Sequence, residues 1–156
     1  MNILKKFSIP ALILLVIGFY YFRYSPKTVE INSLELVDLN GKSVDLKKYQ
    51  NMPLVINFWA TWCGTCIKEM PAFQKAQEEL AGKVNFMYIS EEENQTILNT
   101  VSKRKFQGSF YKTTNSFEKL RIRSWPITYF YNSEGKLVDT NLGIISYAEL
   151  MKIYKK

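Results

Sequence analysis

Two cysteines in a chain without any histidine limit what this sequence can do more than any other feature. They lie in Trp62-Cys63-Gly64-Thr65-Cys66, shortly after the apolar run 54–59. Without histidine there is no Ser-His-Asp or Cys-His nucleophile and no imidazole to bind a metal or carry a proton. A zinc site made of cysteines alone would need two more thiolates from a second chain. Few chemistries remain, and dithiol–disulfide exchange is one of them, so we predict an oxidoreductase with no metal and no cofactor beyond this pair.

The spacing of the cysteines fits a reactive disulfide at the start of a helix. A disulfide needs two Cα atoms roughly 4.4–6.8 Å apart, and two intervening residues at a helix start allow this. The free N–H groups there stabilise a thiolate, which is the attacking species. We predict that Cys63 projects into solvent as the nucleophile and that Cys66, which lies lower, resolves the mixed disulfide. The alternative is a purely structural disulfide, which gains little stability from closing so short a loop.

Glu69 and Trp62 are candidates for roles beside this pair. Glu69 follows Cys66 by three residues and shares its face of a helix, where a carboxylate could take a thiol proton and return it. Spacing alone favours an exposed surface glutamate instead. Trp59 is expected in the core, and Trp62 is expected to shield the dithiol or to bind a substrate protein.

The first 26 residues have the features of a membrane anchor and linker. Lys5 and Lys6 precede an uncharged run at 7–22. As a helix this run would span roughly 24 Å at ~1.5 Å per residue, near the thickness of a bilayer core. The leading lysines predict an N-terminus in the cytoplasm and a domain in the periplasm or on the outer face of a bacterial membrane. The alternatives are a cleaved signal peptide, for which a small-residue cleavage site is missing, and a buried helix.

From residue 27 to residue 156 the pattern predicts one α/β domain, with a central mixed sheet and a helix on each face. Asn40-Gly41 predicts a hairpin turn, and the acids Glu91-Glu92-Glu93 are expected to begin a helix, where they complement its dipole. The dithiol would then lie at the carboxyl end of a central strand. Strands are predicted at 34–39, 42–46, 54–59, 84–89, 110–112, 127–131 and 136–140, and helices at 67–80, 91–105, 117–122 and 146–156.

The charge pattern of the domain argues against a nucleic-acid partner. The net charge is +7, but the short basic clusters at 103–105 and 121–123 have the character of solvated faces, so no nucleic acid is expected as a partner.

Pro126 follows Trp125 just before an apolar strand. For an isolated X-Pro bond, sequence statistics favour the trans form.

A resemblance to a known family rests on two runs of residues. They are Asn57-Phe58-Trp59-Ala60-Thr61-Trp62-Cys63-Gly64-Thr65-Cys66-Ile67-Lys68-Glu69-Met70-Pro71 and Trp125-Pro126-Ile127-Thr128-Tyr129-Phe130. Over about residues 30–156 the chain resembles the thioredoxin superfamily, and more narrowly its membrane-anchored TlpA/ResA-like thiol–disulfide oxidoreductases. The resemblance implies a thioredoxin fold in which the hairpin at 34–46 is an N-terminal addition. It also implies a cis-Pro126 beside the dithiol, Trp125 presented to substrate, and proton handling by Glu69.

The same resemblance implies a function and shows two departures. It implies reduction of disulfides in exported proteins, with apocytochrome c a client typical of the family, and with electrons from a membrane thiol carrier. Asn57 stands where thioredoxin has a buried acid, which leaves Glu69 as the substitute proton acceptor. Thr65 replaces the usual proline before the second cysteine, and this pair tunes thiolate stability. An oxidase or isomerase of the same fold therefore stays open, as does a thioredoxin-fold module that only binds a partner.

Overall fold

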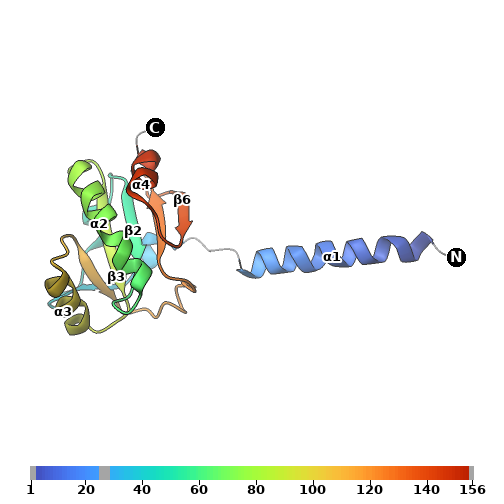
Figure 1. The fold of residues 1–156 in the computed structure, drawn as a ribbon, viewed down its shortest axis with the longest axis horizontal. Coiled ribbons are helices and arrows are strands. Elements are labelled where there is room, and N and C mark those ends of the chain that lie inside the picture. The colour runs from blue at the N-terminus through green and yellow to red at the C-terminus, as the bar shows by residue number, and fades with distance from the viewer. Residues whose placement is uncertain (1–2, 25–28, 155–156) are drawn as a thin grey trace.

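The sheet of this protein is built around two neighbouring strands, β2 (Leu54–Phe58) and β5 (Ile127–Tyr131), that are fully buried. The structure is a computed structural model that describes residues 3–24 and 29–154. Its six strands form a mixed sheet in the order β1-β4-β3-β2-β5-β6 (Figure 1). The strands are β1 (Leu36–Asp38), β2 (Leu54–Phe58), β3 (Asn85–Ser90), β4 (Phe110–Thr113), β5 (Ile127–Tyr131) and β6 (Leu137–Leu142). The helices are α1 (Ile3–Tyr24), α2 (Gly64–Glu79), α3 (Asn94–Arg104) and α4 (Tyr147–Tyr154), with short 3₁₀ helices at Ile31–Ser33 and Leu46–Tyr49.

Strand β2 is the centre of the sheet and explains the apolar run that precedes the dithiol. It pairs in parallel with β3 and antiparallel with β5, and all five of its residues are buried. A strand covered on both faces has no polar side to show, so its sequence does not alternate. The predicted mixed α/β sheet is confirmed. The chain leaves the sheet at the carboxyl end of β2 and enters α2 a few residues later, and this positions the two cysteines.

The two faces of the sheet are covered differently from the prediction. One core cluster gathers residues of α2, α3 and α4, among them Met70, Ile97 and Leu150. The cluster on the other face is closed by residues outside the α-helices, among them Val29 and Phe117. The prediction of a helix on each face of the sheet is therefore wrong, because the three α-helices of the domain all contribute to one cluster.

The helix predicted at 117–122 is a single irregular turn. Ser116 does cap it, because its hydroxyl oxygen accepts a hydrogen bond from the Lys119 N–H at 3.2 Å. Arg121, however, has a φ of 60°, and the Ile122 N–H donates to the Phe117 carbonyl. A left-handed residue ends a right-handed helix, and so short a helix gains too few hydrogen bonds to offset its nucleation cost.

The predicted hairpin at 34–46 forms only in part. Gly41 takes a φ of 85° in the turn, and the Val44 N–H donates to the Leu36 carbonyl at 2.9 Å. With the bond from the Asp38 N–H to the Lys42 carbonyl, this makes one isolated bridge between Val37 and Ser43, and the returning chain forms no strand. The other edge of β1 pairs with β4, so β1 is held by the main sheet. The hairpin therefore adds one edge strand.

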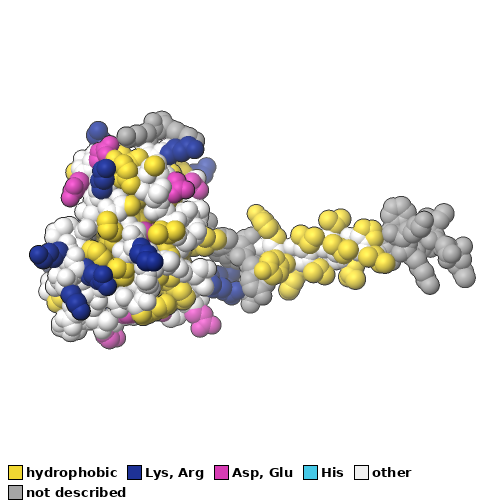
Figure 2. All heavy atoms as spheres, viewed as in Figure 1, with side chains coloured by type: hydrophobic (Ala, Val, Ile, Leu, Met, Phe, Trp, Pro, Cys, Tyr) yellow, Lys and Arg dark blue, Asp and Glu magenta, His cyan; other side chains and the backbone are white. Residues whose placement is uncertain are grey.

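Helix α1 exposes a band of apolar side chains. Figure 1 shows α1 apart from the sheet, and Figure 2 shows hydrophobic side chains along it. Ile9, Leu15 and Tyr21 are among the residues that are more than half exposed. Within the ranges 3–24 and 29–154, however, no helix is long and apolar enough to cross a bilayer. The prediction of a transmembrane helix in residues 1–26 is not supported. Residues 25–26, the end of the predicted anchor and linker, lie outside the described residues.

Gly108 gives a test of how tightly the domain is packed. A Cβ at this position would lie 2.6 Å from Cε2 of Tyr88, and the φ of Gly108 is 135°. Tyr88 is fully buried and stacks on Phe110, so its ring has no room to move. We expect Gly108→Ala to lower the free energy of unfolding by on the order of 3 kcal/mol, measured by urea denaturation.

Gly82→Ala is the matched control for this prediction. Gly82 also has a positive φ, of 72°, but a Cβ there would meet nothing within 4 Å. Gly82→Ala should therefore lower the free energy of unfolding only by the backbone strain, about 1 kcal/mol. Equal losses for the two variants would contradict the packing argument for Gly108.

Candidate active site

The two cysteines form a disulfide at the N-terminus of α2. Their Cα atoms are 5.3 Å apart, and Cys63 is the N-cap residue of the helix. The Cys66 N–H donates to the Cys63 sulfur at 3.2 Å, and the Thr65 hydroxyl lies 3.4 Å from the same sulfur. A thiolate on Cys63 would face these same donors and the positive end of the helix dipole. The arrangement suits Cys63 as the sulfur that carries negative charge.

The disulfide is less accessible than the sequence suggested. Cys63 is only 6% exposed and Cys66 is completely buried. The order of exposure agrees with the prediction, but the projection of Cys63 into solvent is wrong. The start of α2 packs into the core cluster, which includes Ala60 and Met70. Of the two cysteines, only Cys63 has any surface open to a reaction partner.

Aromatic rings connect the dithiol loop to the loop before β5. Trp62 is 68% exposed, and its ring lies 5.6 Å from that of Trp125 in an edge-to-face contact. Trp125 in turn lies 6.0 Å from Phe117, which packs against Phe58 in the core. The peptide bond between Trp125 and Pro126 is cis, as the resemblance implied. The structure thus brings together the two tryptophans and the proline that the sequence separates by more than 60 positions.

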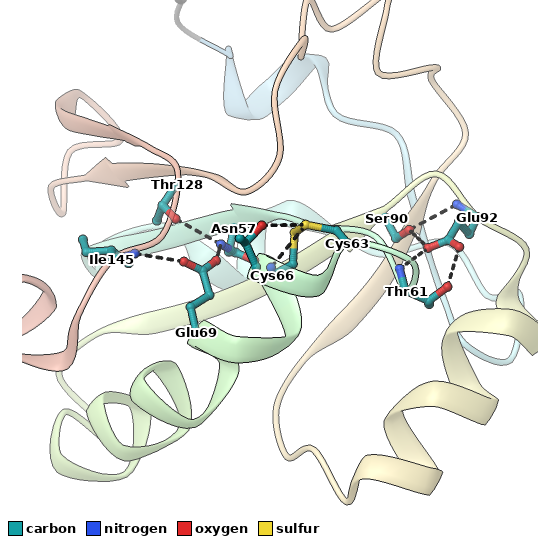
Figure 3. The surroundings of a disulfide bond; sticks show 10 residues. Asn57, Thr61, Cys63, Cys66, Glu69, Ser90, Glu92, Thr128 and Ile145 are labelled. Carbon is teal, nitrogen blue, oxygen red and sulfur yellow. Dashed lines mark hydrogen bonds between the residues drawn. A yellow bond between two sulfur atoms is a disulfide. The ribbon is translucent and has the colours of Figure 1, made fainter.

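Glu69 is a buried carboxylate, so the reading as a surface glutamate is wrong. It is 2% exposed. Its Oε1 accepts from Asn57 Nδ2 at 2.9 Å and its Oε2 accepts from the Ile145 N–H at 3.1 Å (Figure 3). Burial raises the pKa of Glu69 from 4.5 to about 7, although these two hydrogen bonds lower it. The group can therefore hold or release a proton near neutral pH.

Asn57 and Thr128 complete the surroundings of this carboxylate. Asn57 faces Thr128 directly in the pairing of β2 with β5. Asn57 Nδ2 also donates to Thr128 Oγ1 at 3.0 Å, and both residues are fully buried. Sequence reasoning quoted Thr128 only as part of a motif and missed Ile145. The strand register would have pointed to Thr128, but nothing local marks Ile145, which contributes a backbone N–H.

Glu92 is a second functional side chain that sequence reasoning missed. Its carboxylate accepts from the Thr61 N–H and from the Thr61 hydroxyl, both at 2.6 Å, and from the Ser90 hydroxyl at 3.1 Å (Figure 3). The acids at 91–93 were expected in the first turn of a helix, but α3 begins only at Asn94. Glu91 accepts instead from the Phe117 N–H, and Glu93, the N-cap residue of α3, pairs with Lys112. Glu92 thereby holds the loop that leads into Cys63.

The chemistry available at this site is that of the cysteine pair. In the part of the chain that the structure describes, no group of three or more Cys, Asp or Glu side chains could hold a metal ion. The disulfide can accept two electrons, and Glu69 can accept one proton beside it. Together they allow exchange with a disulfide or dithiol of another molecule.

Comparison with known proteins agrees with this geometry. The family described as Redoxin matches residues 23–143. The thioredoxin-like protein YneN of Bacillus subtilis (strain 168) is 28% identical, over 94% of this chain and 95% of that protein. A thiol-disulfide oxidoreductase ResA of Bacillus cereus is 26% identical, over 73% of this chain and 68% of that protein. A thioredoxin family thiol:disulfide interchange protein from Chlorobium tepidum TLS has the same fold, with a TM-score of 0.65 at 20% identity, and covers 76% of this chain and 88% of its own.

Proposed function

Because this chain belongs to the Redoxin family, as a TlpA/ResA-like member of the thioredoxin superfamily, we propose that it reduces disulfides in exported proteins. It is a thiol–disulfide oxidoreductase, and the proposal concerns the direction of transfer and the substrate. The observation that supports it most is the Cys63 sulfur at the start of α2, close to hydrogen-bond donors and nearly two turns before a buried carboxylate. No cofactor beyond the Cys63–Cys66 pair is needed.

The proposed reaction has two exchange steps. The Cys63 thiolate attacks one sulfur of the substrate disulfide, which breaks that bond and forms a mixed disulfide. The Cys66 thiolate then attacks the Cys63 sulfur, forms the Cys63–Cys66 disulfide and releases the substrate as a dithiol. Two electrons pass from the cysteines to the substrate. Glu69 takes the proton that Cys66 loses, and each released substrate thiolate takes up a proton from water.

Trp62, Trp125 and Pro126 are the proposed contacts for the substrate. Trp62 exposes two thirds of its surface next to the nucleophile, and its ring touches Trp125. The Pro126 carbonyl accepts from the Gly143 N–H at 2.8 Å, which ties this loop to the end of β6. A substrate segment that reaches Cys63 would pass over these rings, and Trp125 would present its backbone to it.

The role of Glu69 predicts a change in the pH dependence of thiol alkylation. In the reduced protein an ionised Glu69 opposes ionisation of the nearby thiol, because two negative charges repel. We expect Glu69→Gln to shift the alkylation profile to lower pH by about one pH unit. The measurement is the rate of iodoacetamide reaction between pH 5 and pH 10. Glu78→Gln, an exposed acid on the same helix, is the control, and an unaltered profile for Glu69→Gln would refute the role.

A second candidate, disulfide oxidation or isomerisation, is favoured by one contact. The Thr65 hydroxyl lies 3.4 Å from the Cys63 sulfur and would stabilise its thiolate, which makes a cysteine pair more oxidising. Two reactions distinguish electron donation from electron acceptance. The reduced protein is mixed with insulin, and the oxidised protein is mixed with a reduced, unfolded ribonuclease. Faster reaction with insulin supports the reductase, and faster reaction with the ribonuclease supports the oxidase. A module that only binds its partner would react with neither.

We also propose that the domain lies in the periplasm or on the outer face of the bacterial cytoplasmic membrane. The proposal is supported by the leading lysines, by the apolar side chains of α1, and by the membrane-anchored branch that the sequence resembles. The clients would then be exported proteins, among them apocytochromes c, and the electrons would come from a membrane thiol carrier. A maleimide that does not cross membranes should label the reduced cysteines in intact bacteria. Labelling only after lysis would contradict this location.

A further inference from the structure

The Asn57 side chain is unusual for a fully buried amide. Its Nδ2 donates twice, to Glu69 Oε1 at 2.9 Å and to Thr128 Oγ1 at 3.0 Å. Its Oδ1 has no hydrogen-bond partner among the described residues. A buried carbonyl oxygen without a partner costs free energy, so native structures rarely keep one without a use. The arrangement suggests that Oδ1 is needed in another state of the site.

The two oxygens of Glu69 determine what that other state is. Oε2 faces the backbone N–H of Ile145 at 3.1 Å, and a backbone donor cannot change into an acceptor. A proton on Glu69 is therefore placed on Oε1, which faces the Asn57 amide. With the amide as it stands, the new O–H would point at an N–H. Two donors that face each other in a buried site lose a hydrogen bond and repel.

We propose that the Asn57 amide turns half a rotation when Glu69 becomes protonated, so that Asn57 and Thr128 act as positioning residues for the Glu69 proton. After the turn, Oδ1 accepts from the O–H on Oε1 and from the Thr128 hydroxyl, which changes from acceptor to donor. The oxygen and nitrogen of an amide have nearly the same size, so no backbone atom has to move. The inference rests on the proposed proton handling by Glu69 and adds the partners that make it reversible.

This arrangement explains how a buried carboxylate can both take and return a proton. A fixed donor beside Oε1 would favour the charged form, and a fixed acceptor would favour the protonated form. The turning amide makes two hydrogen bonds in either state and leaves one atom unpaired in either state. Among the described residues, Cys66 lies one turn earlier on the same helix, and Tyr88 on β3 interacts electrostatically with Glu69. Burial raises the pKa of Tyr88, so this tyrosine stays neutral throughout.

The test is an NMR titration of the oxidised full chain, with detergent present for the apolar side chains of α1. The probes are the carboxyl carbon of Glu69 and the two Nδ2 protons of Asn57, followed from pH 5 to pH 9. We expect the Nδ2 signals and their contacts to Thr128 to change with the same midpoint as the Glu69 carbon. In Glu69→Gln the Asn57 signals should show the low-pH pattern at every pH, because the new amide donates as a protonated carboxyl does.

Two further variants separate positioning from packing. Asn57→Ala removes the hydrogen bond to Glu69 from both states, and the charge-assisted bond to the carboxylate is the stronger of the two, so the Glu69 midpoint should rise by less than about one pH unit. Thr128→Val removes one hydrogen bond from each state and should leave the midpoint nearly unchanged. Thr113→Val is the matched control, because this buried threonine on β4 bonds to Asn115. It should change neither the Asn57 signals nor the midpoint.

Distinct results would overturn this inference and the proposed function. Asn57 signals that stay constant while Glu69 titrates, or a Glu69 that does not titrate between pH 5 and pH 9, would overturn the turning amide. An amide that turns as expected, together with an alkylation profile that Glu69→Gln leaves unaltered, would support the inference. That same result would refute the part played by Glu69 in thiol chemistry.

Discussion

Cys63→Ser is expected to lower the turnover of a disulfide substrate by at least about a thousandfold. The reason is that a serine hydroxyl does not ionise near neutral pH and cannot form a mixed disulfide. Cys63 is the only residue of the pair with any exposed surface, since Cys66 is completely buried. The measurement is the rate of insulin reduction by the full chain, with a small dithiol as electron donor and the rate without protein subtracted.

Cys66→Ser is the matched variant, because it keeps the nucleophile and removes only the resolving thiol. It should stop turnover as well, but it should accumulate a mixed disulfide between Cys63 and the substrate, visible on a non-reducing gel. Cys63→Ser should accumulate none. A mixed disulfide that accumulates in Cys63→Ser and not in Cys66→Ser would mean that Cys66 is the nucleophile and Cys63 the resolving thiol. Unchanged activity in Cys63→Ser would refute the assignment of the nucleophile.

Glu69→Gln is expected to make the oxidised protein more stable than the natural chain above pH 7, by on the order of 3 kcal/mol. Burial raises the pKa of Glu69 from 4.5 to about 7 in the folded protein. The stability that Glu69 contributes is therefore fully present below pH 4.5 and is lost as the pH rises through 7. Glutamine keeps an oxygen for the Ile145 N–H and has no proton to lose.

The pH dependence of this difference is what identifies its cause. Urea denaturation at pH 4, 6 and 8 should show almost no difference between the two chains at pH 4 and the full difference at pH 8. Glu78→Gln should show no such trend, because Glu78 is exposed on the same helix. A difference for Glu69→Gln that is the same at every pH would mean that packing, and not protonation, is responsible. A gain in stability together with lost activity would show that the buried acid is kept for its chemistry.

The parts of this site that were predictable from sequence are those that local patterns determine. The apolar run of β2, the cysteine spacing and the helix after it lie within 30 residues, and the structure confirms all three. The cis form of the bond before Pro126 followed from the resemblance, since statistics for a single bond favour trans. Helical spacing placed Glu69 on the face of Cys66, but it said nothing about burial.

The parts that were missed depend on contacts between distant segments. Glu69 is buried because Asn57 and the backbone of Ile145, 76 residues further on, close over it. Glu92 binds Thr61, which lies 31 residues earlier, and no local pattern marks such a pair. The turn at 117–122 is too short for its own hydrogen bonds to decide its form. Its Phe117 N–H donates to Glu91, so tertiary contacts decide it.

The redox potential of the Cys63–Cys66 pair is the most direct test of the central claim, that this protein donates electrons to disulfides. It is measured on the full chain by equilibration with glutathione buffers at pH 7, with the reduced fraction read by thiol labelling. The proposed reductase should have a potential at or below about −220 mV, in the range of thioredoxins and glutaredoxins. A potential near −150 mV, in the range of disulfide-forming proteins, would contradict it.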